Sequence, residues 1–248
     1  MISIKSEKEI QIMEEGGKIL AGIMKELKKK VKPGVTTKEL NRLAESLILK
    51  FNGKPSFKGY EGFPASLCTS VNEEVVHGVP SDRKIKEKDI ISLDLGILYK
   101  GFHTDMAITI AVSEKVNPEV LRLIKVTKKA LKRGIKKVRP GNTIGDIGNT
   151  IQRYVESQGY NVVRELCGHG IGRKVHEDPQ ILNYGKRKTG PKIKEGMVFC
   201  LEPMIAVGDW KLKKSKDGYG YQTKDNSLSA HFEHTIAVTK LGCQTLTE

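Results

Sequence analysis

The chain has few cysteines and no long apolar run. Its four cysteines form no C-x-x-C pair and lie far apart, at Cys68, Cys167, Cys200 and Cys243. This scatter argues against both a disulfide framework and a zinc finger. No apolar stretch is long enough to cross a bilayer, and the first residues lack the apolar centre of a signal peptide. We therefore expect a cytoplasmic protein that does not enter the membrane.

Acidic residues are outnumbered by basic ones. The sequence holds 43 Lys and Arg against 29 Asp and Glu, which gives a formal net charge of +14 at pH 7. A surplus of this size is typical of proteins that bind a polyanion such as RNA. The basic residues are spread along most of the chain, however, so charge alone favours a lysine-rich solvated surface.

The sequence repeats itself, and the repeat matches one acid with another. The segment 85–94 reads IKEKDIISLD and the segment 193–202 reads IKEGMVFCLE, so Asp94 corresponds to Glu202. An acid at the end of an apolar, strand-like run is costly to bury unless it is paired or bound to metal. Two halves that each carry such an acid to a shared centre are expected to build one site between them.

The repeat extends in both directions along the chain. The Lys-Pro-Gly of 32–34 corresponds to the Arg-Pro-Gly of 139–141, and Asp105 in Asp-Met-Ala-Ile corresponds to Glu233 in Glu-His-Thr-Ile. Three segments that match in the same order argue against chance similarity, and their period is too long for a solenoid. We predict one catalytic domain over residues 1–248, built from pseudo-repeat halves of approximately 1–115 and 116–248.

Each half begins with two amphipathic helical patterns and continues in strands. Ser6 with Glu9, and Thr36 with Glu39, have the spacing of capping boxes that begin helices. The strand-like runs are rich in Ile, Val, Thr and Leu. They occupy residues 66–77, 89–98, 104–112, 160–168, 197–207 and 232–239. Helices segregated from mainly antiparallel strands predict an α+β fold in which helices cover one face of a sheet.

Four acids and a histidine form a coherent set of metal ligands. They are Asp94, Asp105, His169, Glu202 and Glu233. Carboxylates with one imidazole suit two divalent ions such as Co, Mn, Fe or Zn, and two ions that share a water convert it to hydroxide near neutral pH. Each acid alone is more often a turn, strand-end or ion-paired residue. Their matching places in the two halves favour the metal site.

Three histidines lie beside glycine or proline. His169 stands between two glycines, which let backbone and ligand come close to it; the alternative is a tight turn with an incidental histidine. His77 in His-Gly-Val-Pro and His176 in His-Glu-Asp-Pro fit no zinc-finger or H-E-x-x-H pattern. We expect one of the three to bind metal and the others to donate hydrogen bonds to substrate. The remaining histidines are interpreted as structural or supporting groups: His103, His231 and His234.

Taken together, these motifs resemble those of type I methionine aminopeptidases. The resemblance rests on Asn72, His77-Gly-Val-Pro, Asp94-Leu-Gly, Asp105, Gly-His169-Gly-Ile-Gly, His176-Glu-Asp-Pro, Glu202-Pro-Met and Phe-Glu233-His-Thr. It covers essentially the whole chain, in order. It implies the pita-bread fold, a pseudo-two-fold α+β domain with a dinuclear metal site at the junction of its halves. It also implies removal of the N-terminal methionine from nascent polypeptides whose second residue is small.

The resemblance implies a role for each ligand. Asp94 would bind one metal ion through both carboxylate oxygens, and Asp105 and Glu233 would bridge the two ions. His169 and Glu202 would complete the coordination of the other ion. A hydroxide activated by both metal ions would attack the scissile carbonyl, and Glu202 would also act as the proton shuttle.

The resemblance places substrate-binding groups as well. His176 would stabilise the tetrahedral oxyanion, and His77 would hydrogen-bond near the scissile amide. The methionine pocket would be lined by aromatic rings and a cysteine, which suit a soft thioether side chain. The pocket residues would be Tyr60, Phe63, Cys68 and Tyr219.

The chain departs from the family pattern around the methionine pocket. Phe57 and Val175 stand where some relatives have cysteine and phenylalanine, and Tyr219 stands where some have tryptophan. These departures concern the pocket and leave the metal ligands intact. Asn72 and Ser229 match a monovalent-cation site of the family, so a monovalent cation is an additional expectation. The chain resembles the short bacterial form, without an extension rich in cysteine and histidine.

The second half carries an additional basic segment between its two acids. The lysines of this segment are Lys211, Lys213, Lys214 and Lys216. An enzyme that trims nascent chains works near the RNA of the ribosomal exit, where lysines dock through a salt-sensitive electrostatic attraction. The alternative is a solvated loop, and the basic run at 186–194 has the same ambiguity. We predict that this segment contacts the ribosome. We also predict that the protein is a monomer.

Two other functions share parts of this pattern. Prolidases and X-Pro aminopeptidases have the same fold, but they usually carry an additional N-terminal domain that this chain is too short to hold. A metal-free pita-bread protein that binds RNA through a basic surface would have lost ligands, whereas all five are present here. Metal analysis separates the RNA-binding protein from the enzyme.

Overall fold

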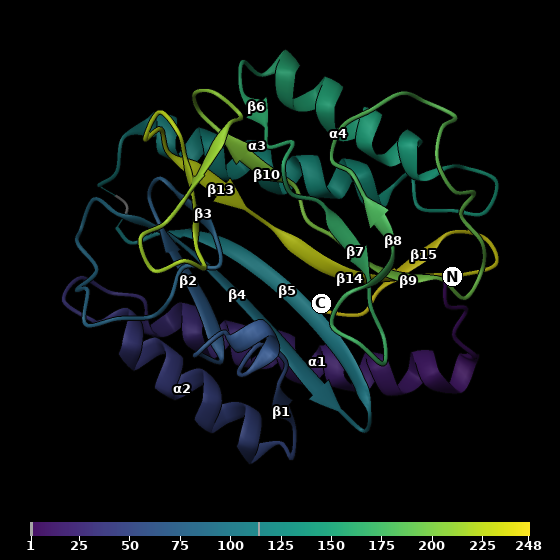
Figure 1. Cartoon of the computed structure of the whole chain (residues 1–248), viewed down its shortest axis with the longest axis horizontal. Coiled ribbons are helices and arrows are strands. Elements are labelled where there is room, and N and C mark those ends of the chain that lie inside the picture. The colour runs from purple at the N-terminus through teal and green to yellow at the C-terminus, as the bar shows by residue number, and fades with distance from the viewer. Residues whose placement is uncertain (1, 114) are drawn as a thin grey trace.

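The computed structural model describes residues 2–113 and 115–248. Its α-helices are α1 (Glu7–Lys30), α2 (Thr37–Lys50), α3 (Pro118–Ile135) and α4 (Ile144–Ser157). A single 3-10 turn, η1, spans Tyr60–Gly62. Figure 1 shows α1 and α2 along one edge of the molecule and α3 and α4 along the opposite edge, with the strands between them. Within the described residues, no helix is both long and apolar enough to cross a membrane.

The main sheet has nine strands, and all of its pairs are antiparallel. Its order is β1-β4-β5-β14-β9-β7-β8, with β2 paired to β4 and β15 paired to β14. The strands are β1 (Lys54–Pro55), β2 (Leu67–Val71), β4 (Ile90–Tyr99), β5 (Phe102–Ala111), β7 (Gly168–Gly170), β8 (Glu177–Ile181), β9 (Val198–Leu201), β14 (Glu233–Val238) and β15 (Cys243–Thr245). The pairing of β5 with β14 joins strands from the two halves of the chain.

Two small sheets lie beside the main one. The first has the order β13-β10-β6, and the second has the order β11-β12-β3. Their strands are β3 (Glu74–Val76), β6 (Asn161–Val162), β10 (Met204–Ala206), β11 (Leu212–Lys214), β12 (Tyr221–Thr223) and β13 (Ser229–His231). The additional basic segment of the second half therefore forms the β11–β12 hairpin, which pairs with β3 of the first half.

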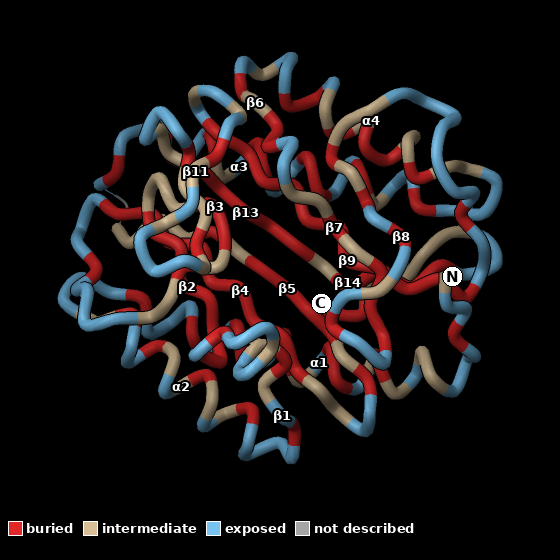
Figure 2. Tube along the Cα trace, in the orientation of Figure 1, coloured by how far each residue is buried: buried red, intermediate tan, exposed pale blue. Residues whose placement is uncertain are grey.

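The helices cover the sheet with their apolar faces. Leu20 of α1 and Ile48 of α2 pack with Leu93 of β4 in one core, and Ile151 of α4 packs with Phe199 of β9 in the other. Burial of each such side chain contributes about 1.5–3 kcal/mol. Figure 2 shows the same division, with the central strands buried and the outer surfaces of the helices exposed. The predicted α+β pita-bread fold, with helices over a curved antiparallel sheet, is confirmed.

The two halves repeat each other in local structure. Thr36 forms an isolated antiparallel bridge with Lys84, and Thr143 forms the corresponding bridge with Lys192. The glycines of the two Pro-Gly turns, at positions 34 and 141, both have φ of +91°, a left-handed conformation that favours glycine. The capping boxes at Ser6, Thr36 and Thr143 all form. The single catalytic domain over residues 1–248, with halves of approximately 1–115 and 116–248, stays a prediction.

Several predicted elements differ from the structure. The run at 160–168 is mostly irregular, because only 161–162 and Gly168 pair with neighbours. The run at 66–77 is split into β2 and β3 by Asn72, whose φ is +61°, and the run at 197–207 is split at Pro203, which has no N–H to donate. Helix α3 ends at Ile135, a few residues before the predicted Arg-Pro-Gly stop.

Candidate functional site

The strand register brings the acids of the two halves to one face of the sheet. Asp94 of β4 lies opposite Ala107 of β5, and Ala107 lies opposite Glu233 of β14. Directly opposite residues share a face of the sheet, and so does Asp105, two residues from Ala107. The small methyl group of Ala107 leaves open space between the flanking carboxylates. Three of the five predicted ligands therefore converge because of strand pairing.

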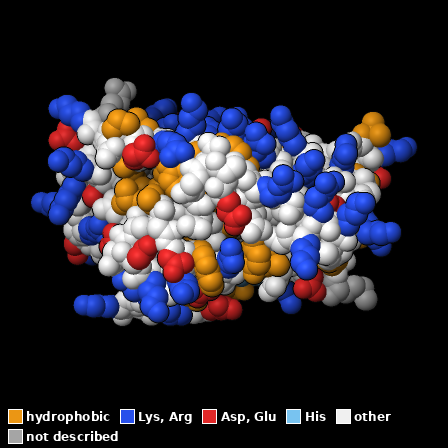
Figure 3. Space-filling model, turned by 90° about the horizontal axis from the view of Figure 1, so that it is seen from above, with side chains coloured by type: hydrophobic (Ala, Val, Ile, Leu, Met, Phe, Trp, Pro, Cys, Tyr) orange, Lys and Arg blue, Asp and Glu red, His pale blue; other side chains and the backbone are white. Residues whose placement is uncertain are grey.

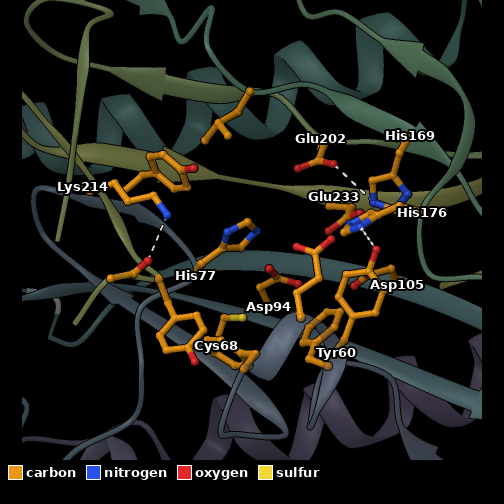
Figure 4. Close-up of a pocket in the computed structure, with 17 residues that line it drawn as sticks. Tyr60, Cys68, His77, Asp94, Asp105, His169, His176, Glu202, Lys214 and Glu233 are labelled. Atoms are coloured by element: carbon orange, nitrogen blue, oxygen red, sulfur yellow. Dashed lines mark hydrogen bonds and ion pairs between the residues drawn. The ribbon is translucent and has the colours of Figure 1, made fainter. Parts of the chain in front are cut away.

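The other two predicted ligands come from the neighbouring strands. Glu202 directly follows β9, in which Leu201 pairs with His234, so the register places Glu202 level with Glu233. His169 lies in β7, on the other side of β9. In Figure 4 the side chains of His169, Glu202 and Glu233 point toward one another from these strands, with those of Asp94 and Asp105 beside them.

The ligand atoms are close enough to share metal ions. Atoms of Asp94, Asp105 and Glu233 lie within 4.8 Å of one another, and His169 Nε2 lies 3.6 Å from Glu202 Oε1. One buried carboxylate oxygen in each of Asp94, Asp105 and Glu233 has no hydrogen-bond partner among the described residues. A buried acceptor without a partner is costly, and divalent ions satisfy such oxygens. The donor set therefore fits divalent metal.

Local structure fixes the orientation of His169. Its Nδ1 lies 2.9 Å from the Gly170 carbonyl, a contact that keeps the ring proton on Nδ1 and leaves the Nε2 lone pair facing the acids. The flanking glycines are required by packing. A Cβ at Gly168 would lie 2.3 Å from the Cys200 carbonyl oxygen, and one at Gly170 would lie 2.1 Å from the Asp178 carbonyl oxygen.

Burial dominates the electrostatics of the site. It raises the pKa of Asp105 to about 7 and that of Glu202 to about 8. Burial, together with the neighbouring carboxylates, raises the pKa of Asp94 and of Glu233 well above their ordinary values. Burial also lowers the pKa of His169 to about 3. The site therefore holds a neutral imidazole and acids that need either protons or a cation.

A cavity of about 320 Å³ opens beside the acids. His176 stands at its wall, with Nδ1 3.0 Å from the Tyr60 hydroxyl and its ring 4.3 Å from the ring of His169. His77 also lines the cavity, from a backbone with φ of +58°. Burial lowers the pKa of His77 to about 4, so its ring is neutral near pH 7. Figure 4 shows His77 and His176 on different sides of the carboxylates.

The predicted methionine-pocket residues line the same cavity. Phe63 and Tyr219 meet edge to face at 5.6 Å, and the Tyr219 hydroxyl donates to the Gly62 carbonyl at 2.8 Å. Cys68 is buried against Phe63 in the same apolar cluster. Phe57, noted in the sequence only as a departure, also joins this cluster and lines the cavity.

The predicted ribosome-binding lysines lie on the β11–β12 hairpin, but they are not equivalent. Lys214 lines the cavity and donates to the Gly218 carbonyl at 2.9 Å. Lys213 donates to the Asn226 side chain at 2.5 Å, and Lys211 lies 3.8 Å from Asp209. Lys216 is exposed. Three of the four lysines therefore have partners within the hairpin and its neighbours, which sequence could not reveal.

Several groups near the site were not assigned chemistry from the sequence. Ligand atoms of His231 and Glu202 lie within 4.8 Å of one another and of Glu233, and Cys200 lies equally close to His169. Strand periodicity could have identified His231 and Cys200. His231 lies two residues before Glu233, and Cys200 lies two residues before Glu202, so each shares a face with a predicted ligand. Ser229 donates its backbone N–H to the Asn72 carbonyl at 3.0 Å. The pair expected at a monovalent-cation site is therefore in contact.

Comparison with known proteins agrees with this geometry. Residues 11–240 match the model of metallopeptidase family M24. A methionine aminopeptidase of Clostridium acetobutylicum is 49% identical over 248 residues, covering 100% of this chain and 99% of the relative. The crystal structure of methionine aminopeptidase from Rickettsia prowazekii superposes with a TM-score of 0.98 at 45% identity, covering 100% of both chains. A prolidase of Pyrococcus horikoshii has a TM-score of 0.77 at 28% identity and covers 99% of this chain, but only 63% of the prolidase is covered.

Proposed function

The chain belongs to metallopeptidase family M24, and from that premise we propose how its site removes an amino-terminal residue. It is a metal-dependent methionyl aminopeptidase, as the full-length likeness to enzymes of that activity indicates. The single observation that carries the assignment is the convergence of five ligands on one sheet face beside an aromatic-lined cavity. The prolidase relative shares the fold at lower identity and extends well beyond this chain.

Five residues would hold the metal ions. In this proposal Asp105 and Glu233 would be shared by two divalent ions, Asp94 would bind one of them, and His169 and Glu202 would bind the other. The unpartnered oxygens of the acids support this assignment. When bound, ions such as Co, Mn, Fe or Zn supply an activated water and polarise the scissile carbonyl. A monovalent cation near Asn72 and Ser229 is a separate part of the proposal, supported by the contact between these residues.

The remaining polar groups would handle the substrate. The Tyr60 hydroxyl faces Nδ1 of His176, so it donates to that nitrogen and leaves an Nε2–H to stabilise the developing oxyanion. His77, a neutral imidazole at the cavity wall, would hydrogen-bond near the scissile amide. Glu202, which lines the cavity beside the other ligands, would carry the proton to the leaving amine.

The apolar end of the cavity would accept the methionine side chain. Phe57, Phe63, Cys68 and Tyr219 surround it with aromatic and sulfur surface. A thioether makes favourable contacts with such rings. The opposite side of the cavity, where His77, Lys214 and Tyr221 stand, would limit the residue that follows methionine to a small one.

The proposal also covers the oligomeric state of the enzyme, its location and its contact with the ribosome. All five ligands come from one chain, so a monomer suffices for activity. Nascent amino termini are the substrate, which places the enzyme in the cytoplasm beside the ribosome. Lys216 is the hairpin lysine best placed for ribosomal RNA, because Lys211, Lys213 and Lys214 have partners within the protein. Ribosome co-sedimentation of a variant with all four lysines changed to alanine tests the contact, and unchanged binding would remove the hairpin from the proposal.

Three peptides test the activity and its selectivity. Metal-loaded enzyme is expected to release free methionine from Met-Ala-Ser, to release little from Met-Leu-Ser, and to leave Ala-Pro-Gly intact. Cleavage of Ala-Pro-Gly in preference to Met-Ala-Ser would assign the chain to the proline-directed branch of the fold. Equal cleavage of both methionine peptides would contradict the limit on the second residue while leaving the chemistry in place.

A further inference from the structure

A polar groove lies between α3 and α4, away from the carboxylates. It has a volume of about 660 Å³. We refer to it as the α3–α4 groove, and its cationic lining consists of Lys129, Arg133, Lys137, Arg139, Arg153 and Arg187. Figure 3, which views the molecule from the side that carries α3 and α4, shows many Lys and Arg side chains and few Asp and Glu.

The positive charge of the groove is almost uncompensated. Asp146 is the one acid that lines it, and its Oδ2 is already used by the backbone N–H and hydroxyl of Thr143. Within residues 2–113 and 115–248, only one of the six cations has a carboxylate within 4 Å. This cation is Arg187, which lies 3.9 Å from Asp146. Like charges gathered in this way repel one another and attract an anion.

The cations are held in a row by the fold. Lys129, Arg133 and Lys137 are spaced four residues apart, which puts them on one side of α3 and its continuing turn. The Arg133 guanidinium lies 4.4 Å from the centre of the Tyr154 ring, and the Lys129 ammonium lies 5.6 Å from it. Tyr154 therefore orders two cations in advance, and an ordered guanidinium suits bidentate contact with phosphate.

The charge is a feature of this helix and not of every helix in the chain. Helix α3 carries six basic residues and one acid, Glu119, whereas α1 carries six basic residues and five acids. A uniform lysine bias would make the two surfaces alike. The excess of positive charge on α3, which lines the groove, is therefore larger than a uniform lysine bias would give.

We propose that the α3–α4 groove binds the phosphate backbone of RNA. The choice of RNA rests on the proposed function, since an enzyme that trims nascent chains works against the RNA surface of the ribosome. Groups that neutralise phosphates give binding that weakens steeply with salt. The groove would then position the enzyme, and the hairpin lysines would be a smaller contact.

The test compares two variants with equal loss of charge. The first changes Lys129, Arg133 and Arg153 to alanine, and the control changes the exposed α1 residues Lys8, Lys25 and Lys28 to alanine. The probe is a fluorescein-labelled RNA hairpin, titrated by anisotropy at several salt concentrations. The groove variant should bind at least about tenfold more weakly, with the log–log salt slope reduced by roughly 2 to 3. The control should keep most of the affinity and slope.

Either of two results overturns the groove. One is wild-type RNA affinity in the groove variant, and the other is an equal loss in both variants, which would mean that net charge alone matters. Release of methionine from Met-Ala-Ser should be unchanged in both variants and reports that they fold. Failure of the peptide assay in wild-type enzyme would count against the proposed function without changing the RNA result.

A second, independent observation concerns His231. Its side chain is 1% exposed, and neither ring nitrogen has a hydrogen-bond partner among the described residues. Its backbone is clamped by Thr109, whose hydroxyl accepts from the His231 N–H and donates to the His231 carbonyl, both at 2.8 Å. Burial of an imidazole whose nitrogens have no hydrogen-bond partner destabilises the fold, unless the ring interacts with a neighbouring group.

The two oxygens of Glu202 face two different imidazoles. Oε1 lies 3.6 Å from His169 Nε2, and Oε2 lies 3.3 Å from His231 Nε2. Glu202 therefore has one oxygen beside each imidazole. From this division we infer that His231 is a positioning residue, whose Nε2 faces Glu202 Oε2 and keeps Oε1 turned toward the metal site. The inference deepens the proposed function and rests on it.

Two substitutions separate positioning from packing. His231→Gln keeps an N–H donor, whereas His231→Leu keeps volume without a donor. Calorimetric titration with Mn should show about 10–100-fold weaker metal binding for His231→Leu, with kcat lowered in parallel, KM little changed, and His231→Gln close to wild type. Equal losses in both variants would assign a purely packing role, and wild-type metal affinity in His231→Leu would overturn the inference. The titration reads metal binding directly, so it is informative even if no peptide is cleaved.

Discussion

At the scale of single residues, the site consists of charges that the folded chain cannot satisfy alone. Asp94, Asp105 and Glu233 each keep one buried oxygen that has no partner within residues 2–113 and 115–248, and burial pushes their pKa values upward. Such groups destabilise the protein unless something positive joins them. Their retention on one sheet face is the physical reason to assign them to metal.

Removal of one bridging charge should abolish turnover. Asp105→Asn keeps the size of the side chain but supplies one neutral oxygen in place of a carboxylate. We expect metal affinity to fall by about 100-fold or more, beyond what loss of a supporting contact typically costs, and methionine release to vanish. Calorimetric metal titration and the peptide assay measure both. Near-wild-type activity with metal in excess would contradict the assignment.

His176 should affect the rate and not the metal. Loss of a donor to the oxyanion typically costs about 10²–10³-fold in kcat, so His176→Ala should fall in this range with metal affinity intact. Tyr60→Phe is the matched control, because it removes only the hydroxyl that faces Nδ1 of His176. Its loss should be smaller. A His176→Ala variant that turns over normally would remove this residue from the mechanism.

At the scale of elements, the sequence predicted the long helices and the ligand-bearing strands because both have strong patterns. Capping boxes marked where two of the helices begin, and β4, β5 and β14 appeared close to their predicted bounds. Six short strands were missed, because two to five residues carry little periodic signal; they are β1, β8, β11, β12, β13 and β15. Strand register, which brings Asp94 and Glu233 to either side of Ala107, also depends on long-range pairing that no local pattern encodes.

Substitution of a glycine in β7 tests how strongly the packing of this strand fixes the position of His169. Gly168→Ala would push a methyl group against the Cys200 carbonyl oxygen, at 2.3 Å. Because neither backbone can yield easily, we expect a loss of about 1–3 kcal/mol in the free energy of unfolding, together with weaker metal binding through His169. Chemical denaturation and metal titration measure the two effects.

An exposed helical glycine provides the control for that substitution. A Cβ at Gly22 of α1 meets nothing within 4 Å, so Gly22→Ala should raise the free energy of unfolding by about 1 kcal/mol through helix propensity. Metal affinity should not change. If Gly168→Ala and Gly22→Ala had the same effect, contact with the Cys200 carbonyl oxygen would not be what excludes a side chain at position 168.

At the scale of the whole molecule, two similar halves meet along β5 and β14, and each half supplies ligands to the seam. Metal held by the proposed ligands would tie the halves together, and its absence would weaken the entire fold. The same arrangement explains why a repeat in the sequence pointed to a single site. The cavity and the ligands lie where the halves join, so neither half holds a complete centre.

The stability of the metal-free protein should fall as pH rises. Asp105 and Glu202, with pKa values of about 7 and about 8 in the fold, hold protons that the unfolded chain releases near pH 4. The folded state therefore binds more protons between about pH 4 and pH 8, and raising the pH through this window favours unfolding. Thermal unfolding of stripped protein should show a lower Tm at about pH 8 than at about pH 5.5, and saturating Mn should remove the difference. A Tm that rises with pH in stripped protein would contradict the description of the buried acids.

The most direct test of the account is a metal titration of activity. Enzyme stripped of metal is titrated separately with Co, Mn, Fe and Zn while free methionine released from Met-Ala-Ser is measured. No release is expected before addition, and release should rise with at least one of these ions until the site is filled. Full activity in the stripped enzyme, or no activity with any ion despite an intact fold, would contradict the assignment of these five residues to catalytic metal.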